Sequence, residues 1–375
     1  MANVSSSNGL EKYPKLRFKG FSEPWKVGTA EELFDNVVDK NHPEETVLTI
    51  IQGQGTLPRE AAGRNIHYDT ESLSGYKRVM KNDYVIHLRS FEGGLEIANS
   101  QGIVSPAYTI LRSKQPCAPL FFDSYFHTDE FINHVLYKAV EGIRDGRQIS
   151  YEAFKWLSIP YCSLEEQTHI AAFIEKINVR IEKQRSLVEN LKKYKRGLLS
   201  FVFKDCSSWE VKPLGNLCRI RTGKLDANAM VADGIYPFFT CARESYKIDT
   251  YAFDCDALLI SGNGANVGYI HHYCGKFNAY QRTYVLDGFN ENIKYIQYFL
   301  EAFLSSRIDS EKKAGNTPYI VLGTLSEMDI FIPSMETQEN IATMLTSIDR
   351  RINLEEQHYS HLTAIHKGIM QSIFI

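Results

Sequence analysis

The chain has 375 residues, of which 43% are hydrophobic and 23% are charged, and its formal net charge is −3. This length leaves room for two or three domains, and the composition is ordinary for a soluble globular protein. The charge argues against binding nucleic acid through indiscriminate positive charge, although it permits a local basic surface. One candidate is 176–204, which carries nine Lys and Arg residues against two acids.

Membrane and metal functions find no support in the sequence. No apolar run approaches the roughly 18–20 residues of a membrane span, and the first residues lack the apolar core of a secretory signal. The seven cysteines show no Cys-x-x-Cys pair and no Cys/His zinc spacing, so they are most simply reduced thiols in a cytosolic protein. We therefore expect a cytoplasmic chain with no metal site and no membrane partner.

A polar N-terminus, 1–16, is expected to be flexible, and the first globular segment follows at 17–158. Its body predicts mainly strands and turns, because short β-branched or aromatic runs alternate with Gly, Asn and Asp. The expected strands are 46–53, 76–80, 83–91 and 107–113, and a helical spacing follows at 130–140.

A long amphipathic helix is predicted within the segment 159–206. Its apolar residues have the alternating four-three spacing of a coiled-coil seam, with Gln184 and Lys195 as polar interruptions. Ser163 is the expected N-cap, and Glu166 completes a capping box. No proline interrupts the run, so at ~1.5 Å per residue the helix is expected to be ~55–60 Å long. The seam consists of Ile170, Ile174, Ile177, Ile181, Val188, Leu191 and Leu198.

The second globular segment, 207–331, has a similar organisation and reads as a second strand-rich α+β domain. The expected strands are 236–242, 256–262, 267–273 and 282–288, and the expected helix is 292–306. The glycine-rich stretch 262–266 lacks the Lys-Ser/Thr of a P-loop and the spacing of a dinucleotide fingerprint, so we expect a turn there.

The last segment, 332–375, repeats the long helix. From Ser163 onward the two copies align without a gap at a constant offset of 171 residues, so that Gln167 falls on Gln338. Each copy alone fits an ordinary amphipathic core helix, but the shared register and interruptions favour an intramolecular helix pair. The second seam is Ile341, Leu345, Ile348, Ile352, Tyr359, Leu362 and Ile369, interrupted by Glu355 and His366. The segment before each body also repeats, because Trp25, Val27 and Leu33 align with Trp209, Val211 and Leu217.

No catalytic motif stands out, whether metalloprotease, serine hydrolase or amino-methyltransferase. What remains are polar residues in or beside turns, which are suited to reading bases. Arg can bridge guanine, and Asn or Gln can bridge adenine, each worth ~1–3 kcal/mol of discrimination. Taken singly, each is more simply a solvated loop residue, and the set gains weight because both bodies belong to one repeated scaffold. The candidates are Gln52, Gln54, Arg59, Arg64, Arg78, Arg89 and Ser90 in the first body, and Arg219, Arg221, Lys224, Arg243, Asn263, Asn266, Gln281, Arg282 and Asn316 in the second.

Along almost its whole length the sequence resembles the specificity subunit of Type I restriction-modification systems. The resemblance rests on PKLRFKGFSEPW at 14–25, on 76–111, and on IPxxSLEEQxxI at 159–170 with its weaker copy at 332–341. The helix ends KRGLL and HKGIM, and the stretches 236–253 and 256–270, add to it. The second copy departs at Glu336-Thr-Gln, and both copies lack the usual second proline after Ile-Pro.

The resemblance implies an α+β fold in which two target recognition domains are held apart by two antiparallel helices with pseudo-twofold symmetry. Each domain would read half of a bipartite, asymmetric site in double-stranded DNA. Sites one duplex turn apart, ~34 Å, face the same side of DNA, which is compatible with a long rigid spacer. The resemblance also implies a non-catalytic chain without a cofactor. Two modification subunits would carry S-adenosylmethionine and methylate adenine, and translocating restriction subunits would join for cleavage.

Two other functions stay open on the sequence. A non-catalytic coiled-coil scaffold that displays two protein-binding domains agrees with the near-neutral charge, and it would show salt-insensitive protein partners. An enzyme in its own right would need a concentrated polar site, and the sequence offers none.

Overall fold

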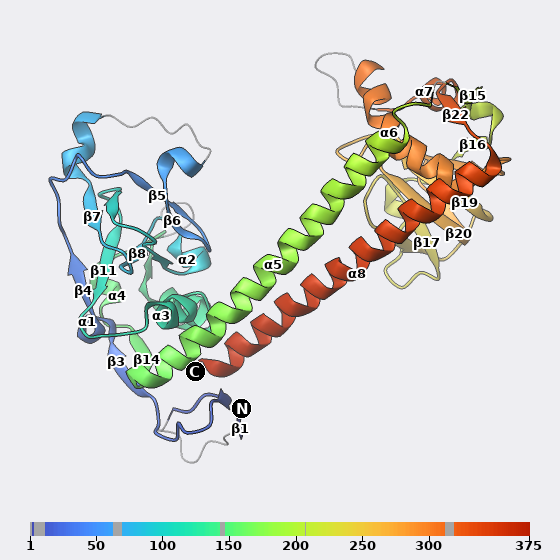
Figure 1. Ribbon diagram of the computed structural model, residues 1–375. Helices are drawn as coiled ribbons and strands as arrows, with labels where there is room; N and C mark the ends of the chain where they lie inside the picture. Colours follow the sequence, from blue (N-terminus) through green and yellow to red (C-terminus); the bar gives the residue numbers. More distant parts are fainter. Residues whose placement is uncertain (1, 4–11, 63–69, 143–146, 207, 312–318) are drawn as a thin grey trace. The chain divides into compact units, whose positions relative to one another are not determined.

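The computed structural model describes residues 2–3, 12–62, 70–142, 147–206, 208–311 and 319–375 (Figure 1). The chain divides into two compact units, Met1–Gln184 with His358–Ile375, and Arg185–Gln357. Each unit therefore contains one body and one end of each of two long helices, α5 (Leu164–Val202) and α8 (Met335–Ile373). Within the described ranges, no helix combines the length and the apolar character that crossing a bilayer requires.

The first body is built around a four-stranded antiparallel sheet with the order β4-β11-β8-β9. Short two-stranded pairings surround it, among them the hairpin β5-β6. Its strands are β1 (Ala2–Asn3), β2 (Leu16–Arg17), β3 (Lys26–Thr29), β4 (Phe34–Val37), β5 (Leu48–Ile51), β6 (Gly55–Pro58), β7 (Lys77–Val79), β8 (Tyr84–Ile86), β9 (Glu96–Ile97), β10 (Gly102–Val104), β11 (Thr109–Ser113), β12 (Val140–Glu141), β13 (Gln148–Ile149) and β14 (Ser158–Tyr161). Its helical segments before α5 are α1 (Ala30–Leu33), η1 (Arg59–Ala62), η2 (Thr70–Gly75), α2 (Ser90–Gly93), α3 (Pro119–Phe126), η3 (Phe131–Val135), η4 (Leu136–Ala139) and α4 (Tyr151–Phe154).

The second body has a six-stranded sheet with the order β16-β21-β19-β20-β17-β18. Its long strands alternate or run apolar, and its buried residues pack against α6. The strands are β15 (Glu210–Pro213), β16 (Arg219–Thr222), β17 (Tyr236–Phe239), β18 (Tyr246–Ile248), β19 (Phe253–Ser261), β20 (Ile270–Ala279), β21 (Thr283–Asp287) and β22 (Asp329–Ile332). The helical segments are η6 (Leu214–Asn216), η7 (Ala227–Ala229), α6 (Ile293–Glu311) and α7 (Leu322–Ser326).

The two bodies, which barely resemble each other in sequence, share one topology. In the first body, the strands come in the chain order β4, β8, β9, β11, and β11 lies between β4 and β8 in the sheet. In the second, β16, β19, β20 and β21 repeat this arrangement, and every pairing among the four is antiparallel in both units. A helix follows the fourth strand in each case, α3 or α6. The repeat therefore extends through the bodies at the level of strand order.

Each body is closed by the same pair of strands. In the first unit β3 pairs with β14, so that Ser158 lies opposite Thr29. In the second unit β15 pairs with β22, so that Asp329 lies opposite Pro213. Ser158 and Asp329 are 171 residues apart, the offset of the two long helices, and Thr29 and Pro213 are 184 residues apart, the offset of Trp25 and Trp209, so the register of the pairing is the same in both units. An aromatic cluster repeats beside it, Trp25–Phe121–Phe374 in the first unit and Trp209–Tyr295–Phe203 in the second.

A buried glutamine at the start of each long helix makes the same contacts in both units. Gln167 accepts a hydrogen bond from Ala118 N (3.2 Å), and Gln338 accepts one from Asn292 N (3.0 Å). Each glutamine also donates to the carbonyl oxygen five residues before it, at 2.9 and 3.0 Å. The side chain thus ties the long helix to the residue that precedes α3 or α6, and it satisfies buried main-chain groups.

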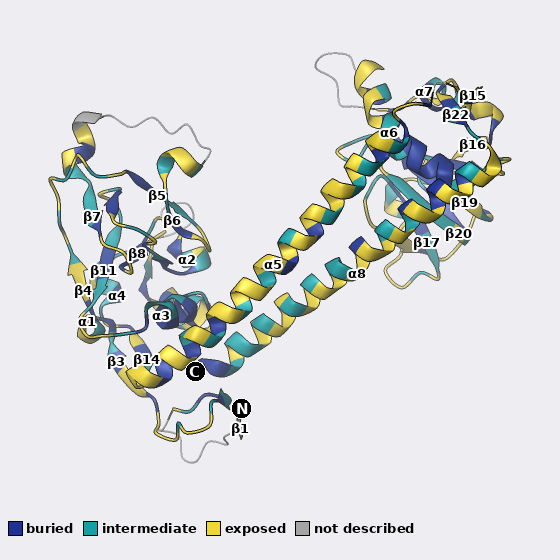
Figure 2. Cartoon of the chain, viewed as in Figure 1, coloured by how far each residue is buried: buried dark blue, intermediate teal, exposed yellow. Residues whose placement is uncertain are grey.

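The long helices pack antiparallel within each unit. In the first, Ile170 and Ile174 of α5 share a core with Phe374, beyond the end of α8. In the second, Leu199 near the end of α5 shares a core with Ile341 and Leu345 near the start of α8. Every position of the two predicted seams is buried or half-buried, and Figure 2 shows such residues recurring along both helices between exposed ones.

The predicted α+β fold with strand-rich bodies and two long helices is confirmed, with local differences. Ser163 caps α5 by accepting from Glu166 N (3.3 Å), but the Glu166 carboxylate is bound to Arg17 through two hydrogen bonds of 2.8 Å. The second half of the expected capping box is therefore missing. The expected helix at 130–140 is a π-helical turn followed by a 3-10 turn. Of the expected flexible N-terminus, Lys12 bridges to Trp25, and 4–11 lie outside the described residues.

Candidate nucleic-acid interfaces

In the second body, several predicted residues meet at one edge of the sheet, around the turn 280–283. Arg282 O accepts from Gly262 N (2.8 Å), which joins this turn to the glycine-rich turn after β19. Gln281 N donates to Leu225 O (2.9 Å), which joins it to the loop after β16. Main-chain hydrogen bonds therefore fix three turns side by side, and the side chains of Gln281 and Arg282 are exposed there.

A fourth segment, the loop after β17, joins the same edge through Asn266 and Arg243. Asn266 Nδ2 donates to Cys241 O (3.1 Å), and Arg243 Nε donates to Asn266 Oδ1 (3.3 Å). The Arg243 guanidinium also lies 5.7 Å from the centroid of the Tyr269 ring, a cation–π geometry that holds the cation in place while leaving it exposed. The edge therefore presents an oriented arginine beside a side-chain amide.

The second-body predictions separate into three groups. The edge brings together Lys224, Arg243, Asn263, Asn266, Gln281 and Arg282. Asn316 lies outside the described residues. Arg221 lies on β16 and, with Arg219, is paired to Asp287 of the neighbouring strand β21.

This Asp287 carboxylate is 1% exposed, whereas the side chains of Arg219 and Arg221 are 70% and 49% exposed. The buried acid therefore orients two cations whose outer parts reach the surface. Burial, and then the hydrogen bond to Asp287, raise the pKa of the Cys255 thiol to about 11, so this cysteine stays protonated at neutral pH.

In the first body, the turn between β5 and β6 places Gln52 and Gln54 at an exposed hairpin tip. Gln52 lies against Gly93 at the end of α2, where a Cβ would overlap the Gln52 amide. Arg89, the residue before α2, is 73% exposed at its side chain and pairs with Glu92 at 3.4 Å. Hairpin tip and α2 therefore form one polar surface.

An ion pair between buried Glu96 and half-buried His127 lies beneath this surface. Glu96 is 1% exposed and accepts from Gly53 N (2.6 Å), Gly55 N (2.9 Å) and His127 Nε2 (3.2 Å). Burial alone would raise the pKa of Glu96, but the hydrogen bonds from His127 and the two glycines lower it overall. Burial alone would lower the pKa of His127, but Glu96 and Asp123 raise it to about 9.

The remaining first-body predictions lie in other surroundings. Arg78 is paired to Glu45 at 2.7 Å, and Arg59 begins η1 in a half-buried position. Ser90 is fully buried, and its Oγ accepts from His87 N (2.9 Å), so its side chain serves the local turn. Arg64 lies outside the described residues.

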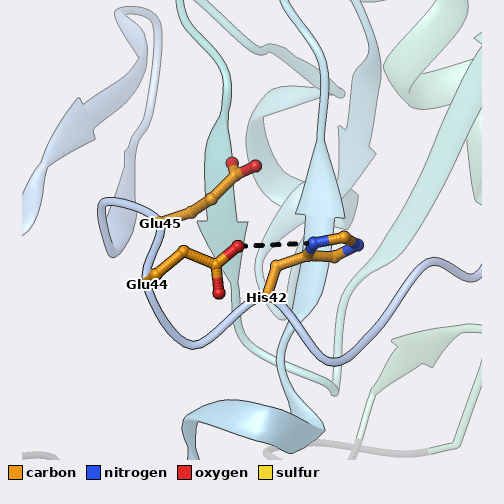
Figure 3. Close-up of side chains that lie close together, drawn as sticks. All are labelled: His42, Glu44 and Glu45. Carbon is orange, nitrogen blue, oxygen red and sulfur yellow. Dashed lines mark ion pairs between the residues drawn. The ribbon is translucent and has the colours of Figure 1, made fainter.

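His42, Glu44 and Glu45 lie close enough together to hold a cation (Figure 3). Their charges are already engaged. His42 Nε2 lies 2.8 Å from Asp39 Oδ1, while Glu45 pairs with Arg78 and accepts from Gln101 Nε2 (2.8 Å). We therefore treat this group as part of the local ion-pair network.

Comparison with known proteins finds similarity to one family. The family described as Type I restriction modification DNA specificity domain matches residues 207–364. A crystal structure of a Type I restriction-modification system S subunit from M. genitalium has a TM-score of 0.64 at 18% identity, covering 96% of this chain and 99% of that chain. Over residues 207–364 the chain matches the Type I restriction-modification specificity family, and over nearly its whole length it shares the fold of that S subunit.

Among members of the specificity family, the Type I restriction enzyme EcoDI specificity subunit of Escherichia coli is 35% identical over 165 residues. The match covers 44% of this chain and 36% of that protein. The EcoprrI specificity subunit of Escherichia coli is 28% identical over 166 residues, covering 43% of this chain and 40% of that protein. The match thus spans well under half the length of these curated relatives. A second solved structure, from work on complex assembly and conformational transition of the type I R-M system, shares the fold at a TM-score of 0.56 and 16% identity, covering 93% of this chain and 97% of that chain.

Sequence reasoning missed the residues that hold the candidate readers in place. Glu96, His127 and Asp287 act through partners that are distant in the sequence, so no local pattern marks them. Tyr269 lies three residues after the glycine-rich stretch 262–266, and an aromatic ring so close to polar turn residues is a usable signal.

Proposed function

We propose that this chain reads a bipartite, asymmetric site in double-stranded DNA, with one body for each half-site. The observation that carries the proposal is the duplicated frame. Strand order, closing register and the buried glutamine recur in both units, whereas the exposed turn residues differ between the bodies. A conserved frame with divergent turns is the organisation expected of two readers with different specificities.

The partners belong to the same proposal. We propose that the chain is non-catalytic and scaffolds two modification subunits, which bind S-adenosylmethionine and methylate adenine, and restriction subunits with translocase and nuclease activity. Support comes from exposed apolar residues seven positions apart on α5, namely Leu187, Tyr194 and Phe201. Such a stripe is typical of a helix surface that receives a partner helix.

The protein-interaction scaffold is the competing function, and the same stripe agrees with it. The two differ in what the bodies bind. A DNA reader loses affinity steeply with salt, because phosphate contacts release counterions, whereas an apolar protein contact does not.

The decisive experiment expresses the chain with the modification subunit encoded beside it in a host without adenine methylation, and maps N6-methyladenine across the genome. We expect one bipartite motif with a fixed spacer, lost when this chain is omitted. A folded complex that binds S-adenosylmethionine and yet methylates no defined motif would favour the scaffold.

A further inference from the structure

The turn Gln52-Gly53-Gln54 presents two side-chain amides on a main chain that is fixed from below. Gly53 N and Gly55 N donate to the two oxygens of Glu96, and Gln54 O accepts from Asn99 Nδ2 (2.7 Å). Gly55 has a φ of 77°, and a Cβ there would come within 2.5 Å of Ile97 O, so this close approach requires glycine. The tip is therefore a rigid platform.

Burying the Glu96 carboxylate beneath the tip costs free energy. Glu96 is 1% exposed, and an ionised carboxylate is buried only when it is paired and hydrogen-bonded. An apolar side chain could fill the same space, but it could not accept from two main-chain amides. By accepting from both amides, the carboxylate fixes the direction in which the tip points.

The position of His127 shows how the charge is balanced. Its Nδ1 lies 2.7 Å from Asp123 O, and its Nε2 lies 3.2 Å from the Glu96 carboxylate. Both neighbours are acceptors, and only the imidazolium form can donate from both ring nitrogens. His127 and Glu96 therefore form an ion pair under the turn.

The side chains at the tip differ from the other first-body candidates. Gln52 and Gln54 are exposed, and neither side-chain amide has a hydrogen-bond partner among the described residues. Arg78 and Ser90, by contrast, are already bound within the body. A side-chain amide can bridge the N6 and N7 edge of adenine with two hydrogen bonds. Next to the tip, exposed Arg89 is suited to a phosphate.

We propose that Gln52 and Gln54 are the specificity-determining residues for one half-site, and that Glu96, held by protonated His127, is the positioning residue that aims them. The inference rests on the proposed DNA-reading function. Glu96 touches no base itself, so its effect must pass through the turn.

The test uses the full chain in its complex and compares methylation motifs by sequencing. Gln52→Ala and Gln54→Ala are expected to relax discrimination at base pairs of one half-site by roughly 5- to 100-fold. Glu96→Gln is expected to relax the same base pairs, because one oxygen and the charge are lost. The other half-site serves as an internal reference and stays unchanged.

Glu92→Gln is the matched control, because Glu92 lies on the adjacent α2 and pairs only with exposed Arg89 among the described residues. It should leave the motif intact. Hydrogen exchange supplies a readout independent of activity. Glu96→Gln should speed exchange at 48–58 while 77–86 keeps its rate.

The double variant Gln54→Ala with Glu96→Gln decides whether Glu96 acts through the turn. No loss beyond that of the more severe single variant supports the inference, and additive losses overturn it. If Glu96→Gln fails to fold, His127→Gln takes its place with the same expectations. A wild-type motif that survives the glutamine variants unchanged overturns the inference alone, whereas a wild-type complex without a motif overturns the proposed function and the inference together.

Discussion

Gln167 and Gln338 occupy equivalent positions in the sequence repeat and make equivalent hydrogen bonds in the two units. Each is buried at the start of a long helix and connects it to the residue before a body helix. The sequence repeat aligns the two glutamines but does not show why a glutamine is needed at this position. The reason is that each satisfies one buried donor and one buried acceptor of the main chain.

Gln167→Met should therefore destabilise the first unit by roughly 2–4 kcal/mol, because the main-chain groups of Ala118 and Cys162 lose their partner while the volume is kept. Thr168→Ala, at the next and exposed position, should change the free energy of unfolding by less than about 0.5 kcal/mol. Urea denaturation followed by circular dichroism measures both. Equal stabilities of the two variants would contradict this account of the glutamine.

The pH dependence of the first unit should reveal His127. Its folded pKa of about 9 exceeds the ordinary value of 6.5, so its contribution is complete below pH 6.5 and is lost as pH rises through 9. Relative to His127→Gln, the wild type should therefore lose unfolding free energy across this range. The titratable groups that face the His127 ring are Glu96, Asp123 and His87. His134→Gln is the control, because His134 is exposed, and its unfolding free energy should show the same pH dependence as that of the wild type.

At the scale of elements, a partly buried cation links the long helices to the second body. Lys195 Nζ lies 2.7 Å from both Glu301 of α6 and Asp349 of α8, and 5.0 Å from the Tyr298 ring centroid. Burial alone would lower the pKa of Lys195, but the two carboxylates raise it, so the side chain stays charged. The predicted interruption of the α5 seam is thus an ion-pair centre.

Lys195→Ala should cost about 2–3 kcal/mol of unfolding free energy, because it leaves two carboxylates close together without their cation. Lys192→Ala, one turn earlier, removes a pair with Glu356 in which both side chains are more than 40% exposed, and it should cost about 0–1 kcal/mol. Denaturation of the full-length variants in low and in high salt measures the loss of unfolding free energy for each lysine. A similar cost for both lysines would mean that burial does not set the strength of these pairs.

How far the sequence predicts each element depends on the range of the interactions that form it. Seam periodicity is local, so the long helix predicted within 159–206 agrees with α5, and β11 and β21 followed from β-branched runs. The edge strands β4 and β16 were not expected, because DNV and RIR carry little strand signal and are strands through their pairing with β11 and β21. The same limit applies to the sites. Turn chemistry marked Gln54 and Arg243 as candidate readers, but their supports Glu96 and Tyr269 depend on contacts across the fold.

At the scale of the whole molecule, the repeated frame predicts that specificity can be exchanged without rebuilding the scaffold. The frame contacts of the second unit lie outside the sheet turns. Asn292 with Gln338, Tyr298 with Asp349, and Lys195 with Glu301 all involve α6 or the residue before it. The candidate reading edge lies wholly between β16 and β21, apart from Tyr319.

We therefore expect that replacing only 218–289 by the corresponding segment of a member of the matched specificity family transfers one half-site and keeps the spacer length. The wider replacement of 207–331 should transfer the same half-site, but at a cost in stability, because it also replaces partners of Lys195 and Gln338. Methylation motifs and denaturation of both chimaeras give the two readouts. Since the first body is untouched, the other half-site must stay constant in each chimaera. A change in both half-sites would mean that the two bodies read DNA jointly, and an unchanged motif would place the reading residues of the second unit outside the edge formed by its turns.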